Sequence, residues 1–284
     1  ELSIKRKIEA TGLPLKEWNI NIYRGVLTGF NKAFIITGKK KQEILDNCKD
    51  EAEKKRTNEI IRPILRGKDI KSYTYSWNEL WLIYIPWHFP LQLDRTIQGA
   101  SEKAEKAFKK QYPAVYSHLL QYKEQLSARN NAETGIRYEW YAMQRWGANY
   151  WDEFDKPKIG WARLMRLSKN DLDSFPRFCL IPKKFIVVDS LCFFTGVDTE
   201  LLVKELNSEF ASWYFFNNVA VLDNGGFQMR QQYIEEIPLP KFNDNKKSID
   251  EQIYKAFAFN KEEIDFIKSV IKMKKQEIKL AMLK

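Results

Sequence analysis

The sequence predicts an α+β fold, a mixed sheet with flanking helices followed by a long C-terminal helix. Three observations lead to this prediction. Runs of β-branched and aromatic residues cluster at residues 20–37 and 156–194. Between them, residues 101–129 place apolar side chains at helical spacing. After residue 244, apolar residues recur every seven positions, as they do in a long helix with one apolar side.

The first third of the chain is predicted to mix strands and helices. Apolar and polar residues alternate ahead of Gly25, and a β-prone run at residues 33–37 follows Gly29, so we expect a hairpin. Residues 40–56 are charged and helical in pattern, whereas residues 80–87 resemble a buried strand.

Two helices and three strands are predicted in the middle of the chain. Ser101 is placed to cap the first helix, and Pro113 is placed to start the second. The strand-like segments are "KPKIGWARL", "RFCLIP" and "KFIVVDSLCFF". A further helix is expected from Thr199, with Leu202, Leu206, Phe210 and Trp213 on one face.

The tail differs from the rest of the chain. Ser248 and Glu251 form an S-x-x-E capping box, and an apolar seam follows at Phe257, Ile264, Ile267, Ile271 and Ile278. We therefore divide the chain into residues 1–243, an α+β domain, and residues 244–284, an amphipathic helical tail. The seam suits either packing on the chain's own domain or pairing with a partner helix.

Composition points to a folded protein with a polyanionic partner. Hydrophobic residues make up 44% of the 284 residues, and the formal net charge is +10. The three cysteines and two histidines are scattered without metal-ligand spacing, which predicts no metal site and fits a reducing cytosol. Since no apolar run approaches the length of a membrane span, we expect a cytoplasmic protein without a membrane partner.

The motifs of common catalytic sites are missing. The stretch "GVLTGFNKAF" lacks the spacing of a P-loop, no two glycines are two residues apart as in G-x-G, and no adjacent prolines form an N-P-P-Y motif. Acid-x-lysine triplets occur at Glu53, Asp244 and Glu277, which leaves a stand-alone metal nuclease as an unfavoured alternative. No catalytic residue is assigned to this chain.

An arginine-rich and aromatic stretch is the strongest functional signal from composition. Six of the thirteen arginines fall between residues 129 and 177, among tryptophans, tyrosines and amides. Arginine can form two hydrogen bonds with guanine, and glutamine can form two with adenine, which predicts contact with DNA bases in the major groove. The base-reading candidates are Arg129, Arg137, Gln144, Arg145, Arg163, Arg166, Gln228 and Arg230. The DNA-backbone candidates are Arg24, Lys32, Lys68 and Lys71.

Several segments carry a family resemblance. In order, they are "GVLTGFNKAFII", "EIIRPILRGKDIKSY", "YPAVYSHLLQYKEQLSAR", "KPKIGWARL", "LNSEFASWYFF" and "FQMRQQYIEEIPLP", and they span roughly residues 20 to 240. Together they resemble the TaqI-like C-terminal specificity domain. This is the target recognition domain of type IIG restriction-modification enzymes and related adenine-N6 DNA methyltransferases. Within this resemblance Gly25, Thr28, Gly29 and Asn31 are expected to shape a scaffold turn rather than bind a nucleotide.

The resemblance implies a reader of double-stranded DNA that positions an adenine for N6 methylation. S-adenosylmethionine and Mg²⁺ would belong to methyltransferase and nuclease domains outside this chain, joined in cis or in trans, so the chain alone is expected not to be an enzyme. The alternative is a specificity subunit whose tail assembles separate methyltransferase and nuclease chains.

Overall fold

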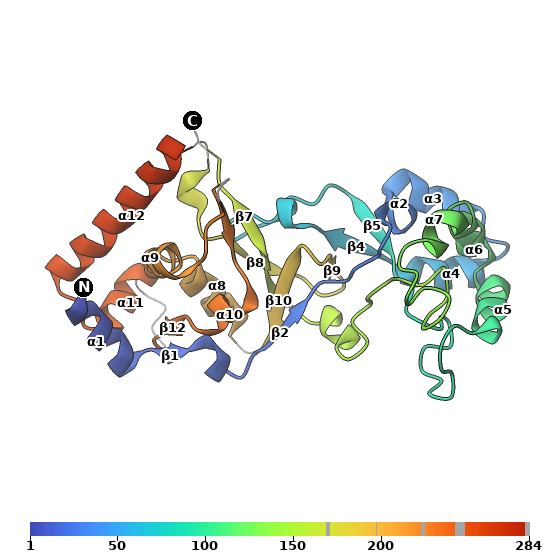
Figure 1. The fold of residues 1–284 in the computed structure, drawn as a ribbon, viewed down its shortest axis with the longest axis horizontal. Coiled ribbons are helices and arrows are strands. Elements are labelled where there is room, and N and C mark those ends of the chain that lie inside the picture. The colour runs from blue at the N-terminus through green and yellow to red at the C-terminus, as the bar shows by residue number, and fades with distance from the viewer. Residues whose placement is uncertain (169–170, 197, 223–224, 242–247, 282–284) are drawn as a thin grey trace.

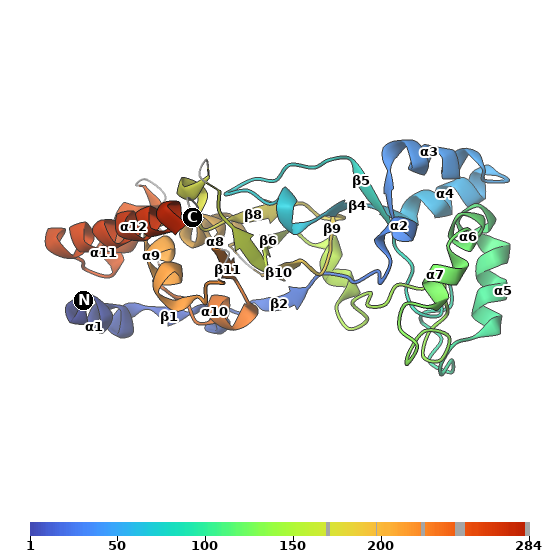
Figure 2. The ribbon, with the colours of Figure 1, turned by 45° about the horizontal axis from the view of Figure 1, so that its top comes forward.

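The computed structural model describes residues 1–168, 171–196, 198–222, 225–241 and 248–281. The molecule is elongated, with helices at each end and sheets between them (Figures 1 and 2). The N-terminal and C-terminal helices share one end, and residues 31–127 supply the helices of the other. Sheets flanked by helices, with a long helix close to the C-terminus, confirm the predicted α+β fold.

Four antiparallel strands form the central sheet in the order β2-β10-β6-β8. They are β2 (Asn21–Arg24), β10 (Leu191–Thr195), β6 (Lys158–Ala162) and β8 (Phe178–Ile181). Successive side chains of a strand point to opposite faces, so Phe193 packs in one apolar core and its neighbour Phe194 in the other. The central sheet is therefore buried on both faces and joins two cores.

A second four-stranded sheet has the order β3-β5-β4-β9. Its strands are β3 (Ile35–Thr37), β5 (Leu80–Ile83), β4 (Ile61–Leu65) and β9 (Ile186–Val187). Strands β4 and β9 run parallel, and the other pairs are antiparallel. Because β9 directly precedes β10, the β4–β9 pairing ties the second sheet to the central one.

The helices at the same end of the molecule as the second sheet pack in one of the two cores. They are α2 (Asn31–Phe34), α3 (Gly38–Asp46), α4 (Glu51–Ile60), α5 (Glu102–Gln111), α6 (Pro113–Leu120) and α7 (Lys123–Ser127). The Ser101 hydroxyl accepts a hydrogen bond from the Ala104 amide at 3.2 Å, and Pro113 stands in the first turn of α6. Both predicted helix starts are confirmed.

Helices from both termini surround the other core. They are α1 (Leu2–Thr11), α8 (Thr199–Leu206), α9 (Glu209–Asn218), α10 (Gln231–Glu235), α11 (Ile249–Ala256) and α12 (Lys261–Ala281). Two short antiparallel pairs complete this end, β1 (Leu13–Pro14) with β12 (Pro238–Leu239) and β7 (Leu164–Arg166) with β11 (Gly226–Gln228). Short 3-10 helices are η1 (Leu15–Glu17), η2 (Gly67–Asp69), η3 (Trp151–Asp155) and η4 (Leu172–Ser174).

The predicted hairpin over residues 20–37 is wrong. Strand β2 pairs with β10, while β3 pairs with β5, so the two runs belong to different sheets. At Gly25 the backbone passes so close to the β9–β10 connection that a Cβ would lie 2.0 Å from the Val188 carbonyl oxygen. At Gly29, φ is +77°, and the chain then enters α2. The two glycines separate the strands instead of joining them in a hairpin.

Two predicted helices are each interrupted. The helix from Thr199 ends at Leu206, and the Ser208 hydroxyl caps a new helix, α9. In the tail, Ser248 caps α11 as predicted, but the chain turns at Ala258, where φ is +52°. A second capping box then starts α12, since Asn260 Oδ1 accepts from the Glu263 amide and Glu263 Oε2 accepts from the Asn260 amide.

The apolar seam of the tail is used inside this chain. Phe257, Ile267 and Ile271 are buried in the core that also contains α8 and α9. The expected boundary between Asn243 and Asp244 lies outside the described residues. Among the described helices, none combines the length and apolar character needed to span a bilayer.

Candidate nucleic-acid interface

The β7–β11 ribbon presents polar side chains on one face. Met165 and Phe227 pair across the ribbon and are 1% and 2% exposed, so they anchor its inner face in the core. Because strand side chains alternate, Arg166 and Gln228 belong to the opposite face. Gly226 stands across from Arg166 and adds no side chain beside the guanidinium. The ribbon therefore holds an exposed arginine and a half-buried glutamine on a buried support.

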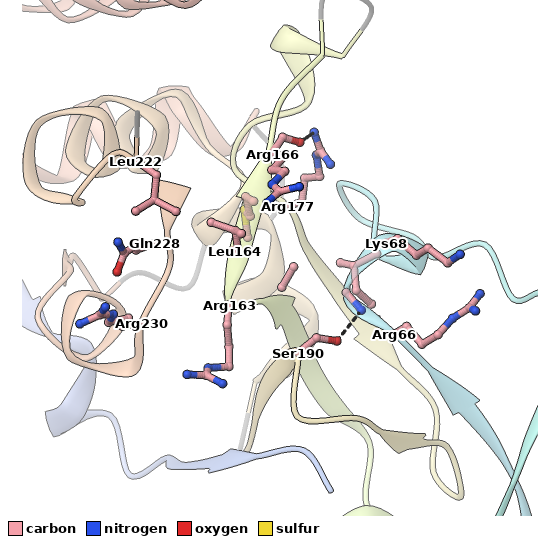
Figure 3. Close-up of a pocket in the computed structure, with 14 residues that line it drawn as sticks. Arg66, Lys68, Arg163, Leu164, Arg166, Arg177, Ser190, Leu222, Gln228 and Arg230 are labelled. Carbon is pink, nitrogen blue, oxygen red and sulfur yellow. Dashed lines mark hydrogen bonds between the residues drawn. The ribbon is translucent and has the colours of Figure 1, made fainter. Parts of the chain in front are cut away.

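The outer face of the ribbon borders a cleft of about 870 Å³ (Figure 3). Gln228 and Arg230 lie on one side of it, and Arg66 and Lys68 lie on the other. The cationic side chains in the cleft wall are Arg66, Lys68, Arg163, Arg166, Arg177 and Arg230. Among the described lining residues there is no carboxylate, so the cleft suits a polyanion.

Arg66 is bound to the turn that carries Lys68. Its Nε and Nη2 donate to the two carboxylate oxygens of Asp69, each at 3.0 Å, and Asp69 also accepts from the Arg66 amide at 2.8 Å. The Gly67 amide donates to the Ser190 hydroxyl at 3.0 Å, which ties η2 to the segment before β10. The exposed Lys68 thus extends from a rigid turn.

Arg177 holds the end of β7 in place. Its guanidinium donates to Asp171 Oδ2 at 2.8 Å and to the Arg166 carbonyl oxygen at 3.0 Å. Two of the six cations in the cleft, Arg66 and Arg177, therefore have carboxylate partners. The other four, Lys68, Arg163, Arg166 and Arg230, have none in the part of the chain that the structure describes.

Three arginines surround Asp189 next to the cleft. Arg24 Nη2 lies 3.2 Å and Arg145 Nη2 lies 3.8 Å from Asp189 Oδ2, while Arg163 donates to the Asp189 carbonyl oxygen at 3.1 Å. Burial lowers the pKa of the Arg145 guanidinium, and the nearby Arg24 charge lowers it further. One carboxylate among three guanidiniums leaves this cluster positive, and Arg163 links it to the cleft.

The Arg129 side chain is bound to the backbone of its own chain. Its guanidinium and Nε donate to the backbone carbonyl oxygens of Leu126, Thr28, Trp140 and Ala142. Burial lowers its pKa to about 10. Gln144 lies beside it, against Gly29. These contacts occupy the Arg129 donors, and neither Arg129 nor Gln144 lines the cleft, so we leave both out of the proposed reading set.

The remaining candidates are exposed but lie outside the cleft lining. Arg137 pairs with Glu133 at 2.6 Å and lies over the Trp87 ring. Lys32 is in α2, and Lys71 follows η2 by two residues. The structure therefore gathers Lys68, Arg163, Arg166, Gln228 and Arg230 of the predicted set in one cleft.

The expected scaffold turn has the contacts of a structural turn. The Thr28 hydroxyl donates to Asn31 Oδ1 at 2.6 Å, and the Thr28 side chain is buried. The Gly25 amide donates to the Leu191 carbonyl oxygen at 3.0 Å. These bonds fix the crossing from the central sheet to the second sheet.

The acid-x-lysine triplets do not converge on a metal site in the described ranges. Glu53 is buried, and its carboxylate accepts from the Ala114 and Lys49 amides. Glu277 pairs with Lys274, and Asp244 lies outside the described residues. No cluster of histidine, cysteine and acidic side chains suited to a metal occurs among the residues that the structure describes.

Arg66 and Ser190 were not among the predicted contact residues, and Arg177 was counted only as part of the arginine-rich stretch. An Arg–Asp pair three residues apart around Gly67 was the available signal for Arg66. No local pattern marks Ser190, because its role comes from its contact with the Gly67 amide, 123 residues away in the sequence.

Known proteins resemble the chain in sequence and in fold. Its sequence is 24% identical, over 241 residues, to the type II methyltransferase M.MjaIV of Methanocaldococcus jannaschii, covering 83% of this chain and 70% of that protein. Its fold resembles that of the type IIG restriction endonuclease BpuSI, with a TM-score of 0.55 and 14% identity, covering 98% of this chain and 32% of that one.

A weaker likeness, with a TM-score of 0.46 and 13% identity, is to the type IIL restriction-modification enzyme MmeI, solved in complex with DNA; it covers 95% of this chain and 33% of that one. The chain thus spans about a third of the length of either solved enzyme. Residues 62–239 match the family model of the TaqI-like C-terminal specificity domain, and the chain belongs to this family.

Proposed function

We propose that this specificity domain binds duplex DNA sequence-specifically, mainly in the major groove, through the cleft between the β7–β11 ribbon and η2. The observation that carries the proposal is the cleft wall, with six cations and no carboxylate among its described residues. A two-stranded β-ribbon is narrow enough to enter the major groove of B-DNA. Family membership supports a recognition role.

The ribbon side and the η2 side of the cleft would have different tasks. Arg166, Gln228 and Arg230 would read base edges. Arginine can donate two hydrogen bonds to guanine, and a glutamine amide can donate to adenine N7 while its oxygen accepts from the N6 amino group. Lys68 would hold a phosphate and contribute affinity without sequence preference. Arg66 and Arg177 would act as positioning residues, because each is held by a carboxylate. The cluster of Arg24, Arg145 and Arg163 around Asp189 would extend the positive surface.

The catalytic chemistry would belong to other domains or chains. By gripping its site, this domain would hold one adenine where a methyltransferase domain can flip it out and methylate N6. That domain would bring S-adenosylmethionine, and a nuclease domain would bring Mg²⁺. We further propose a cytoplasmic protein whose recognition domain ends near residue 243 and is followed by the helical tail.

The alternative of a helical assembly subunit receives less support. Its partner helix would need the seam of the tail, but Phe257, Ile267 and Ile271 of that seam are buried in the chain's own core. A stand-alone nuclease also receives less support, because Glu53 is bound to backbone amides and Glu277 to a lysine.

A paired substitution tests the division of tasks. With the preferred duplex known, Arg166→Ala should lose about 1 to 3 kcal/mol of discrimination at one base pair. Lys68→Ala should weaken matched and mismatched duplexes alike and reduce the slope of log K against log salt by about 1. Both side chains are exposed, so both variants should fold. Equal losses on matched and mismatched duplexes for Arg166→Ala would remove it from the reading set.

A further inference from the structure

Helix α12 is held firmly by one face. Ile267 and Ile271 are buried in the core around α9. At its start, Glu263 accepts from Lys7 Nζ at 2.7 Å and from the Ser3 hydroxyl, both on α1. The orientation of the remaining surface of α12 is therefore fixed by the core and by α1.

A stripe of lysines runs along the outer surface of this helix. Lys268, Lys272, Lys275 and Lys279 are spaced four, three and four residues apart. At about 100° per residue, this spacing keeps all four within an arc of roughly 60°. Over residues 268–281 the sequence has five lysines and a single acid, Glu277, which pairs with Lys274 off this stripe. We call these four residues the lysine stripe.

The lysine stripe borders a groove of about 450 Å³, whose other lining residues include Leu172, Asp173 and Glu209. Lys275 pairs with Asp173 at 2.8 Å, and Lys268 lies 3.7 Å from Glu209. Lys272 and Lys279 have no carboxylate partner within the described ranges. Half of the stripe is thus available to an external anion.

The stripe adjoins the wall of the basic cleft. Helix η4 lies in the connection from β7 to β8, and Figures 1 and 2 both place the C-terminal end of α12 beside it. In this connection Asp171 holds Arg177 of the cleft, while Asp173 holds Lys275 of the stripe. The two basic surfaces therefore meet at one short segment.

The stripe is long enough to contact several phosphates of duplex DNA. Eleven residues of helix separate Lys268 from Lys279, which corresponds to about 16 Å along the axis. Each strand of DNA carries a phosphate per 3.4 Å of its axis, so the stripe is as long as about five phosphates. Lysine is a flexible point charge that suits phosphate rather than base edges.

We infer that the lysine stripe of α12 binds the phosphate backbone of duplex DNA that flanks the site held in the cleft. This inference rests on the proposed function, because it assigns the flank of the same duplex to a second surface. The contact adds affinity and leaves sequence preference unchanged, since phosphates carry no sequence information.

The test compares two double variants of the full chain. Lys272→Gln with Lys279→Gln removes the two unpaired charges of the stripe, and Lys106→Gln with Lys110→Gln removes two exposed charges from α5 at the other end of the molecule. Binding is measured against salt on a long duplex extending beyond the preferred motif and on a short duplex ending at it. Circular dichroism would check that both variants are folded.

On the long duplex, log K of the stripe variant should fall less steeply with log salt than log K of the wild type, with a slope about 2 smaller in magnitude. The loss should be equal for matched and scrambled sequences and absent on the short duplex, and the α5 variant should bind as the wild type does. An unchanged slope on the long duplex, with the wild type binding normally, would overturn the inference alone. A wild-type chain that binds neither duplex would overturn the proposed function as well.

Discussion

Replacing Glu205 with glutamine should remove a pH dependence from the stability of the fold. The Glu205 side chain on α8 is 0% exposed, and in the described part of the chain neither carboxyl oxygen has a hydrogen-bond partner. Burial raises its pKa from 4.5 to about 8. The folded state therefore keeps a proton that the unfolded chain has already released, and stability falls as pH rises from about 4.5 to 8.

The expected magnitude follows from this shift. One pKa unit corresponds to 1.36 kcal/mol, so a folded-state pKa of about 8 predicts a loss of about 3 to 4 kcal/mol between pH 5 and pH 8. Glu205→Gln keeps the shape of the side chain without the ionisable group. It should be nearly as stable as the wild type at pH 5 and more stable by about 3 kcal/mol at pH 8.

Urea unfolding followed by circular dichroism at pH 5, 6, 7 and 8 measures this difference. Glu200→Gln is the matched control, because Glu200 lies on the same helix but is exposed. It should change stability by less than about 0.5 kcal/mol. The reasoning would be refuted if the free energy of unfolding changed with pH in the same way for the wild type and Glu205→Gln from pH 5 to pH 8. The core would then stabilise the ionised Glu205 carboxylate.

Two further predictions concern the contact between Glu263 and helix α1 and the close backbone approach at Gly25. Lys7 and other donors around Glu263 hold its pKa well below the usual range, at about 2. The ionised carboxylate therefore stabilises the folded state above pH 4.5, and this stabilisation is lost as pH falls toward 2. Glu263→Gln should flatten the acid limb of the unfolding profile, and an unchanged limb would contradict this. Gly25→Ala should destabilise the chain by about 3 kcal/mol or more, because its Cβ would meet the Val188 backbone. Gly135→Ala, with open space but a φ of +78°, should cost only about 1 to 2 kcal/mol in the same urea assay.

Local signals predicted the elements whose structure depends on neighbouring residues. Ser101 and Pro113 start α5 and α6 as expected, because a cap and an N-terminal proline act within one turn. The same rule could have divided the tail, since Asn260 and Glu263 form a second capping box with N-x-x-E spacing. The seven-residue repeat obscured that break, because it continues from Phe257 through the turn into α12.

Contacts between distant segments limited the prediction of the interface. Strands β7 and β11 have three residues each and lie about sixty positions apart, so no local pattern indicates their pairing. Composition alone grouped Arg129 with Arg166, although the first bonds backbone carbonyls and the second is exposed. A guanidinium in a core and one at a surface have the same sequence signature, and the fold separates them.

The most direct test is a binding selection of the purified chain on a randomised duplex pool, with the retained DNA sequenced and the salt dependence recorded. The basic cleft predicts one enriched motif and salt-sensitive binding, with a log–log slope that steepens by about 0.9 for each phosphate that the protein contacts. Binding without an enriched motif, or no binding at moderate salt, would contradict the claim that this domain reads DNA sequence by itself.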